Sequence, residues 1–292
     1  MRRMLVVVLS MVLVVGMTGM VLADNNNVDI EQWVNDSEAY VTQKGSGNDG
    51  FVIQESWGYR KSGIPANDPM FSDIFQSGNN NEADIYQYMD GGLMSAWITQ
   101  KNGSFNTADI DQFKQYGMDG IASVLQKNGN WNEATVDQQQ GNKAIVKQNG
   151  TGNISDVLQI GYGSNGKVWT IQQGDYNQDY YTENDVYSSI GRMEQYGSYN
   201  IANITQDGRE GESHDELNTA KVYQYNNYNE TTIDQTGSNN FVKVTQNGTW
   251  NYSELIQLGL NNRITVEQLD NSSDAFVEQE GNGNIADVNQ SN

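Results

Sequence analysis

Glutamine returns at a fixed interval of 11 residues through the C-terminal part of the chain, from Gln224 to Gln290. With small insertions the series continues back to Gln32 and gives 21 units in a chain of 292 residues. Self-similarity at a fixed period indicates stacked repeats, so the fold is not an ordinary globular one. The anchoring glutamines are Gln32, Gln43, Gln54, Gln76, Gln87, Gln100, Gln126, Gln138, Gln148, Gln159, Gln172, Gln195, Gln206, Gln224, Gln235, Gln246, Gln257, Gln268, Gln279 and Gln290. Gln112 completes the series and is the least certain anchor, because Gln115 competes with it.

The positions before each anchor form restricted and mixed columns. Two residues before it, Val, Ile, Leu or Met stands in 20 of 21 units, with Thr170 as the exception. Four before, the residue is small or β-branched in every unit, whereas the position just before the anchor varies from Asp137 to Lys147 and Leu158. Restricted columns are packed and mixed columns face water. In the strand 153–159 the inner face is therefore Asn153, Ser155, Val157 and Gln159.

Asparagine and glycine also recur at fixed places. Six residues before the anchor, Asn stands in 14 units, and Gly stands two residues after it in 11 units. We expect the asparagines to stack on one another and the glycines to supply the positive φ angles of tight turns. The stacking asparagines are Asn48, Asn81, Asn106, Asn132, Asn142, Asn153, Asn200, Asn218, Asn229, Asn240, Asn251, Asn262 and Asn284. The turn glycines are Gly45, Gly150, Gly237, Gly248, Gly259 and Gly281.

The repeat predicts an all-β fold. Six or seven alternating residues make a strand of about 20 Å, and two strand–turn units make one rung of about 22 residues. Rungs that stack in parallel place like residues above like, so each buried carboxamide can bond to identical amides above and below. The sequence therefore predicts a parallel β-solenoid of about 10–12 two-strand rungs, spaced at about 4.8 Å. We expect irregular insertions near 55–72, 113–120, 173–190 and 207–217.

The first 23 residues read as a secretory signal peptide. Arg2 and Arg3 precede an apolar run that ends at Val21-Leu22-Ala23, with cleavage expected after Ala23. A membrane anchor is the alternative, since Leu5 to Leu22 is nearly long enough to span a bilayer, but no basic flank follows. We therefore expect an exported protein whose residues 24–292 form a single solenoid domain with no membrane association after cleavage.

The net charge and the cysteine content exclude several classes of partner and binding site. Without Arg2 and Arg3 the chain has 14 basic and 37 acidic residues, a net charge of −23. This excess argues against nucleic acid or anionic lipid as the main partner. The chain has no cysteine, so disulfides and thiolate metal sites are excluded. The many Asn, Gln and Gly residues are periodic, which argues against a disordered tract.

The repeat resembles that of the curlins, the subunits of curli. The segment from Gln279 to Gln290 follows Q-x-G-x-G-N-x-A-x-x-x-Q throughout. Gln148 to Asn153 and Gln43 to Asn48 carry Q-x-G-x-G-N, and Ser273 to Gln279 shows the S-x5-Q opening. The resemblance implies an extracellular functional amyloid of bacterial biofilms, with the Asn and Gln columns as stacking positions. The chain is about twice as long as familiar curlins. Its repeats begin at residue 26, so we expect no glycine-rich export leader.

Residues for catalysis or metal binding are sparse. His214 is the only histidine and lies in an acidic stretch, Glu210 to Glu216, that reads as a solvated loop. Carboxylate pairs such as Asp109 and Asp111 occur, but outward charges that keep the surface soluble explain them better. The G-G-x-G-x-D turn of calcium-binding β-rolls is missing from the sequence, which leaves only loose surface binding of calcium. We expect no enzyme activity, cofactor or metal site.

The aromatic residues fall mostly outside the packed columns. Structural packing between fibrils or across strands is the first interpretation, and a carbohydrate or adhesion face is the second. The aromatics concerned are Tyr40, Trp97, Trp131, Trp169, Tyr223, Trp250 and Phe276.

The leading functional hypothesis is a secreted structural subunit that adds head to tail into amyloid-like fibres for biofilm matrix and cell adhesion. Open solenoid edges template further strands unless they are capped, and neither end of this repeat looks capped. Gln290 and Val288 would lie at one growing face, and Val28, Ile30 and Gln32 at the other. A monomeric adhesin or a minor nucleator subunit are the alternatives. Expected partners are further copies of the chain, a nucleator subunit, export machinery and cell or abiotic surfaces. Assembly should quicken near about pH 4–5, as carboxylates lose their charge.

Overall fold

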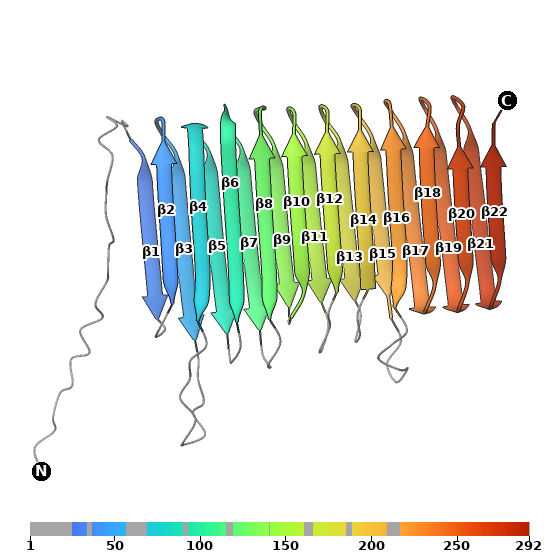
Figure 1. Cartoon of the computed structure of the whole chain (residues 1–292), viewed down its shortest axis with the longest axis horizontal. Coiled ribbons are helices and arrows are strands. Elements are labelled where there is room, and N and C mark those ends of the chain that lie inside the picture. Colours follow the sequence, from blue (N-terminus) through green and yellow to red (C-terminus); the bar gives the residue numbers. More distant parts are fainter. Residues whose placement is uncertain are drawn as a thin grey trace, which may run out of the picture.

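A computed structural model describes residues 25–33, 37–56, 69–89, 93–114, 119–139, 141–160, 166–184, 189–208 and 217–291. These residues form two 11-stranded sheets, in which every pair of neighbouring strands is parallel. The odd-numbered strands form one sheet, the odd sheet, and the even-numbered strands form the other, the even sheet (Figure 1). One odd and the following even strand make a rung. The predicted all-β parallel solenoid with two strands per rung is confirmed.

The strands of the odd sheet are β1 (Asn27–Trp33), β3 (Asp49–Ser56), β5 (Glu82–Met89), β7 (Thr107–Lys114), β9 (Glu133–Gln139), β11 (Ile154–Ile160), β13 (Gln178–Asn184), β15 (Ile201–Asp207), β17 (Glu230–Ser238), β19 (Tyr252–Leu260) and β21 (Asp274–Asn282). Those of the even sheet are β2 (Glu38–Lys44), β4 (Met70–Asn79), β6 (Met94–Ser104), β8 (Gly120–Lys127), β10 (Lys143–Asn149), β12 (Lys167–Gln173), β14 (Ser189–Tyr196), β16 (Asn218–Tyr225), β18 (Phe241–Asn247), β20 (Arg263–Gln268) and β22 (Ile285–Gln290).

The inward face of each strand is the one that the restricted columns indicate. In β11, Ser155, Val157 and Gln159 are at most 1% exposed, whereas Ile154 and Leu158 lie on the outer side of the sheet. The core between the two sheets contains the aliphatic column and the small-residue column. Small side chains bring the sheets close together, so a narrow core is filled without voids. Burial therefore follows the column rather than hydropathy alone.

One of the four expected insertions needs correction, and the central parts of the other three lie outside the described residues. We expected an irregular insertion over 173–190, but the structure places a complete strand, β13, within it. The reason is that β13 carries Glu183 where other strands carry glutamine, so the glutamine pattern skips it. His214 and the expected signal peptide lie outside the described residues as well. Gln112 pairs with Gln87 and Gln138 in the register of the odd sheet, and Gln115 also lies outside the described residues.

The turns between rungs use positive φ angles at two positions. At the first, Gly150 has a φ of 130°, and a Cβ there would collide with the carbonyl oxygen of Gly174 in the next rung. The expected turn glycines 45, 237, 259 and 281 also have positive φ values. Gly248 differs from these glycines because its φ angle is not positive. It lies in a turn, but only close approach to the carbonyl oxygen of Asp270 requires glycine there.

Aromatic residues occupy the second positive-φ position in most turns from even to odd strands. Trp131, Tyr228 and Trp250 have φ values of 61°, 58° and 65°. This conformation costs about 1–2 kcal/mol for an L-residue. Stacking on the equivalent ring of the next rung offsets part of that cost, since an aromatic pair contributes about 0.5–1.5 kcal/mol.

Candidate assembly surfaces

The glutamines of the even sheet form an unbroken column of side-chain hydrogen bonds. Each Nε2 donates to the Oε1 of the glutamine in the next rung, at 2.8–3.3 Å from Gln43 through to Gln290. Most amides use their second N–H on a backbone carbonyl across the rung, as Gln148 does on Glu133 at 2.8 Å. The donors of the glutamine-to-glutamine bonds therefore all point toward the C-terminal end of the solenoid.

The asparagines stack at the turns, and their side-chain bonds run the opposite way. The backbone N–H and Nδ2 of Asn153 both donate to Oδ1 of Asn132 in the previous rung, at 3.0 and 3.1 Å. The column is continuous from Asn48 to Asn251 before the odd strands, and a second column runs from Asn218 to Asn284 before the even strands. Asn142 stands apart and accepts from the backbone N–H of Gly166 at 3.1 Å. Sequence reasoning missed Asn177, which occupies the first column inside the skipped rung.

β13 interrupts the glutamine column of the odd sheet. Glu183 accepts from Nε2 of Gln159 at 2.9 Å, but a carboxylate cannot pass a donated bond to the next rung. Tyr181 replaces the missing donor, because its hydroxyl donates to Oε1 of Gln206 at 2.7 Å. Its ring fits because the facing residue is Gly191, where a Cβ would collide with the tyrosine. The Tyr181 hydroxyl thus continues the hydrogen-bonded column across this rung.

Strand β13 departs from the repeat pattern at a third residue, Asp179, which lies buried in the small-residue column. Its side chain is 0% exposed, and neither carboxylate oxygen has a hydrogen-bond partner among the described residues. Burial raises the pKa of Asp179 well above its ordinary value. An unpartnered buried carboxyl costs stability, so Asp179 destabilises this rung relative to one that carries alanine at the same position.

The first and last rungs expose the inward columns that every other rung buries. Val52 and Val266 are 0% exposed, whereas Val28 in β1 is 47% exposed. In β22 the inward residues Ala286, Val288 and Gln290 are all only partly buried. Within the residues that the structure describes, nothing packs over these two ends. Exposed apolar columns and strand edges of this kind template further strands.

The two ends offer complementary hydrogen-bonding groups. At the C-terminal end, Nε2 of Gln290 donates to the carbonyl of Asp274 at 2.8 Å and lacks the ladder bond that Gln268 makes. At the N-terminal end, Oε1 of Gln32 and Oε1 of Gln43 accept no bond from a described residue, although both amides donate onward. One end therefore presents unused amide N–H groups, and the other presents unused amide oxygens.

The two broad faces of the solenoid differ in charge, which the 11-residue comparison concealed. The outward positions of the odd strands carry 18 acidic residues and neither Lys nor Arg. These are Asp29, Glu31, Asp49, Glu55, Glu82, Asp84, Asp109, Asp111, Glu133, Asp137, Asp156, Asp207, Glu230, Asp234, Glu254, Asp274, Glu278 and Glu280. We call this surface the odd face.

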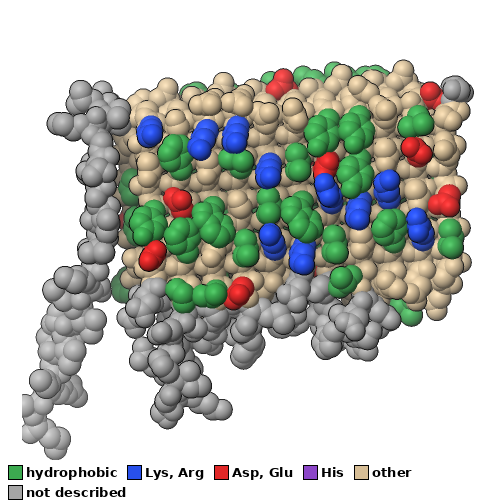
Figure 2. All heavy atoms as spheres, viewed as in Figure 1, with side chains coloured by type: hydrophobic (Ala, Val, Ile, Leu, Met, Phe, Trp, Pro, Cys, Tyr) green, Lys and Arg blue, Asp and Glu red, His purple; other side chains and the backbone are tan. Residues whose placement is uncertain are grey.

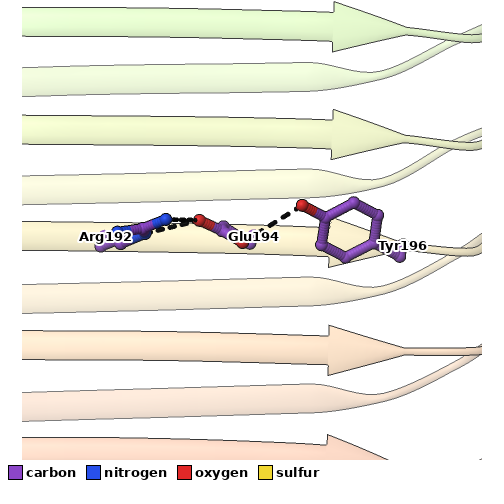
Figure 3. Close-up of polar contacts among 3 residues, drawn as sticks. All are labelled: Arg192, Glu194 and Tyr196. Atoms are coloured by element: carbon purple, nitrogen blue, oxygen red, sulfur yellow. Dashed lines mark hydrogen bonds and ion pairs between the residues drawn. The ribbon is translucent and has the colours of Figure 1, made fainter.

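The outward positions of the even strands, the even face, carry ten basic residues and only five acidic ones. The basic residues are Lys44, Lys101, Lys127, Lys143, Lys147, Lys167, Arg192, Lys221, Lys243 and Arg263. Figure 2 shows these cations spread over the face among apolar side chains. Arg192 pairs with Glu194, which also accepts from the Tyr196 hydroxyl at 3.2 Å (Figure 3). The other nine cations make no ion pair within the described ranges.

Aromatic rings run along the turns from even to odd strands. Tyr199 stacks on Tyr228 with centroids 5.0 Å apart, and Tyr228 stacks on Trp250 at 4.2 Å. A second pair, Phe105 and Trp131, stacks at 4.4 Å. These stacks pack rings along the solenoid axis. Trp131 and Trp250 stay 62% and 60% exposed, so a carbohydrate or adhesion face is still an open interpretation.

Crowding of carboxylates on the odd face makes stability depend on pH. Partial burial, followed by the charges of Glu82, Asp109 and Asp49, raises the pKa of Asp84 to about 6. Burial and the neighbouring aspartates also raise the pKa of Asp111 to about 6. A carboxyl whose pKa is higher in the folded chain than in the unfolded chain stabilises the fold while it is protonated. This stabilisation is complete below about pH 4. That stability is lost as pH rises through about 6.

We therefore expect the melting temperature of the chain to be higher at pH 4.5 than at pH 7.5. Asp84→Asn should raise the melting temperature at pH 7.5 by about 2–4 °C and leave it nearly unchanged at pH 4.5. Asp207→Asn, at the exposed end of β15, is the matched control and should change neither value. Circular dichroism at both pH values measures this, and a higher melting temperature at pH 7.5 would contradict the expectation.

The family comparison agrees with this architecture. A family model described as curlin associated repeat matches residues 218–248 and 237–269. The matched segments cover β16 to β20, where the 11-residue period is uninterrupted. Residues 218–269 therefore carry curlin associated repeats. The same Gln register continues through the rungs on either side of the match, from Gln32 to Gln290. No curated protein matches the chain.

No described helix is long and apolar enough to cross a membrane. The described side chains contain no group of three or more His, Cys, Asp or Glu that could hold a metal ion.

Proposed function

We propose that this curlin-repeat protein is a secreted structural subunit that polymerises head to tail into curli-like extracellular fibres for biofilm matrix and adhesion. The observation that carries the proposal is the complementarity of the two ends. Stacking the first rung of one copy on the last rung of another continues both sheets in register. Gln279 and Gln290 then donate to Gln32 and Gln43 of the next copy, as Gln257 and Gln268 donate to Gln279 and Gln290 within the chain.

The junction also buries the exposed apolar columns. Val277 meets Ile30 of the next copy, and Val288 meets Val41. Burying one aliphatic side chain contributes about 1.5–3 kcal/mol. The junction adds a full set of parallel-strand hydrogen bonds, so it should resemble any internal boundary between rungs. The polarity of the glutamine bonds allows head-to-tail addition and disfavours head-to-head pairing.

The test is electron microscopy of residues 24–292 with blocking substitutions at the ends. Wild-type chains should form unbranched filaments a few nanometres wide. Val288→Lys and Ile30→Lys each place a charge in a junction, so each variant alone should stay monomeric. A mixture of the two retains one intact pair of ends and should stop at dimers, which analytical ultracentrifugation detects.

Asn289→Lys is the matched control, because Asn289 is exposed beside Val288 on the same strand. This control should form filaments normally. Filaments from Val288→Lys, or a wild-type chain that stays monomeric for days, would sink the head-to-tail proposal in favour of a monomeric adhesin. If wild-type monomers extend only pre-formed filaments of another subunit, or start them, the chain is a minor component of the fibre.

A further inference from the structure

We propose that the even face of one solenoid packs against the odd face of a second copy, so that solenoids associate side to side as well as end to end. This inference goes beyond the proposed function, because it concerns the broad faces and applies equally to single chains. It rests on the charge of the two faces and on their shape.

The odd face carries no cation, and on the even face only Arg192 of the ten cations makes an ion pair within the described residues. On the odd face, Asp84 lies beside Asp109 in the next rung, and Asp111 lies beside Asp137. On the even face, Lys143 lies beside Lys167, and Lys221 beside Lys243. Like charges directly opposite each other on neighbouring strands are destabilising. A partner of opposite charge laid over each face would offset this repulsion.

The partner best suited to both faces is another copy of the same chain. Charged residues on each face recur at the rung spacing of about 4.8 Å, so rows on one copy match the repeat of rows on the other. Free anions or cations from solution would satisfy only one face. A second copy covers the basic even face of the first with its own acidic odd face. The two outer faces of this pair are again complementary in charge, so a third copy can bind. Repetition of this contact yields layered bundles.

The faces are large and flat enough for a stable contact. Eleven strands per sheet, spaced at about 4.8 Å and about 20 Å long, give each face about 1,000 Å². Standard protein interfaces bury about 800 Å² on each partner. The strands stay nearly aligned along the whole solenoid, so neither face is strongly twisted (Figure 1). Exposed rings add apolar contact, including Phe276 at 68% exposure on the odd face and Tyr40 at 43% on the even face.

The experiment compares three sets of charge reversals by filament width and by the pellet fraction at low centrifugal speed. The even-face variant combines Lys143→Glu, Lys147→Glu, Lys167→Glu, Lys221→Glu and Lys243→Glu. The odd-face variant combines Asp84→Lys, Asp109→Lys, Asp111→Lys, Asp137→Lys and Asp156→Lys. The third variant carries both sets, which restores the wild-type net charge but leaves both faces with more acidic than basic residues.

Wild-type filaments should bundle in low salt and separate as salt rises from about 0.02 to about 0.5 M, where the Debye length falls severalfold. The even-face variant, in which both faces are acidic, should reduce the pelleted fraction about tenfold, and the odd-face variant should reduce it less. The combined variant should stay as low as the even-face variant despite its wild-type net charge, which separates face complementarity from net charge. Far-UV circular dichroism checks that each variant is folded. Undiminished bundling by the even-face variant, or wild-type bundling that ignores salt, would overturn the proposal.

The same measurements separate this inference from the proposed function. Thioflavin T fluorescence reports filament formation whether or not filaments bundle. If wild-type chains form no filaments, ultracentrifugation in low salt should still detect salt-sensitive dimers of single solenoids, and their absence would overturn the pairing. Wild-type chains that stay single in low salt but bind heparin through the even face would likewise overturn it and identify an anionic polysaccharide as the partner.

Discussion

Gln172→Leu should lower the free energy of unfolding by about 3 kcal/mol or more, because it removes a fully buried link of the glutamine column. Gln172 accepts from Gln148 at 2.9 Å and donates to the carbonyl of Ile154 at 2.8 Å and to Gln195 at 3.3 Å. Leucine preserves the volume but leaves these three groups without a partner. Each unsatisfied buried polar group costs about 1–3 kcal/mol.

Gln173→Leu is the matched control, since the same change one residue later falls on the exposed side of β12. It should alter the unfolding free energy by less than about 0.5 kcal/mol. Urea unfolding in the Val288→Lys background allows the comparison on single chains. Equal effects of the two substitutions would mean that the amide column contributes little to stability.

Asp179→Ala should stabilise the chain by about 1–3 kcal/mol at pH 7, because it removes a buried carboxyl that has no partner in the described structure. Alanine is the commonest residue of that column, so it fits without strain. Burial raises the pKa of Asp179, so wild-type stability should fall as pH rises from below about 4 toward neutrality. The variant should show a smaller fall.

Asp207→Ala removes an exposed carboxyl and serves as the control for charge. Urea unfolding between about pH 4 and pH 8 measures both variants, over the range in which aspartate normally ionises and beyond. A wild-type stability that rises with pH to the same extent as that of Asp179→Ala would contradict this account of β13.

The repeat predicted the fold because one local rule recurs in every unit. A residue column can stay limited to small or β-branched residues, or to aliphatic ones, only if the same narrow space surrounds it in each rung. Period-two alternation within a unit then determines which side chains face inward. For this reason Ser155 and Val157 could be placed inside, and Ile154 outside, from the sequence alone.

Where a rung departs from that rule, the sequence pattern failed. Asp179, Tyr181 and Glu183 occupy the three inward positions that normally hold Ala, an aliphatic residue and Gln. No local pattern reveals that Gly191 provides the space for Tyr181, or that its hydroxyl replaces a glutamine donor, since these contacts join different strands. The aromatic turn residues were missed as positive-φ positions because the stacking that offsets their strain lies between rungs.

The sequence by itself determined the strand, the turn and the inward face of nearly every repeat, because these depend on short-range alternation and on one repeated environment. Only the tertiary structure decided how the charged side chains are shared between the two broad faces, because the 11-residue comparison treats the strands of both sheets as one set of columns. Alternate units lie on opposite sides of the core, so the 11-residue period becomes a 22-residue one in space. That separation gathers the carboxylates on one face and the cations on the other, and it leaves the amide donors and acceptors at opposite ends.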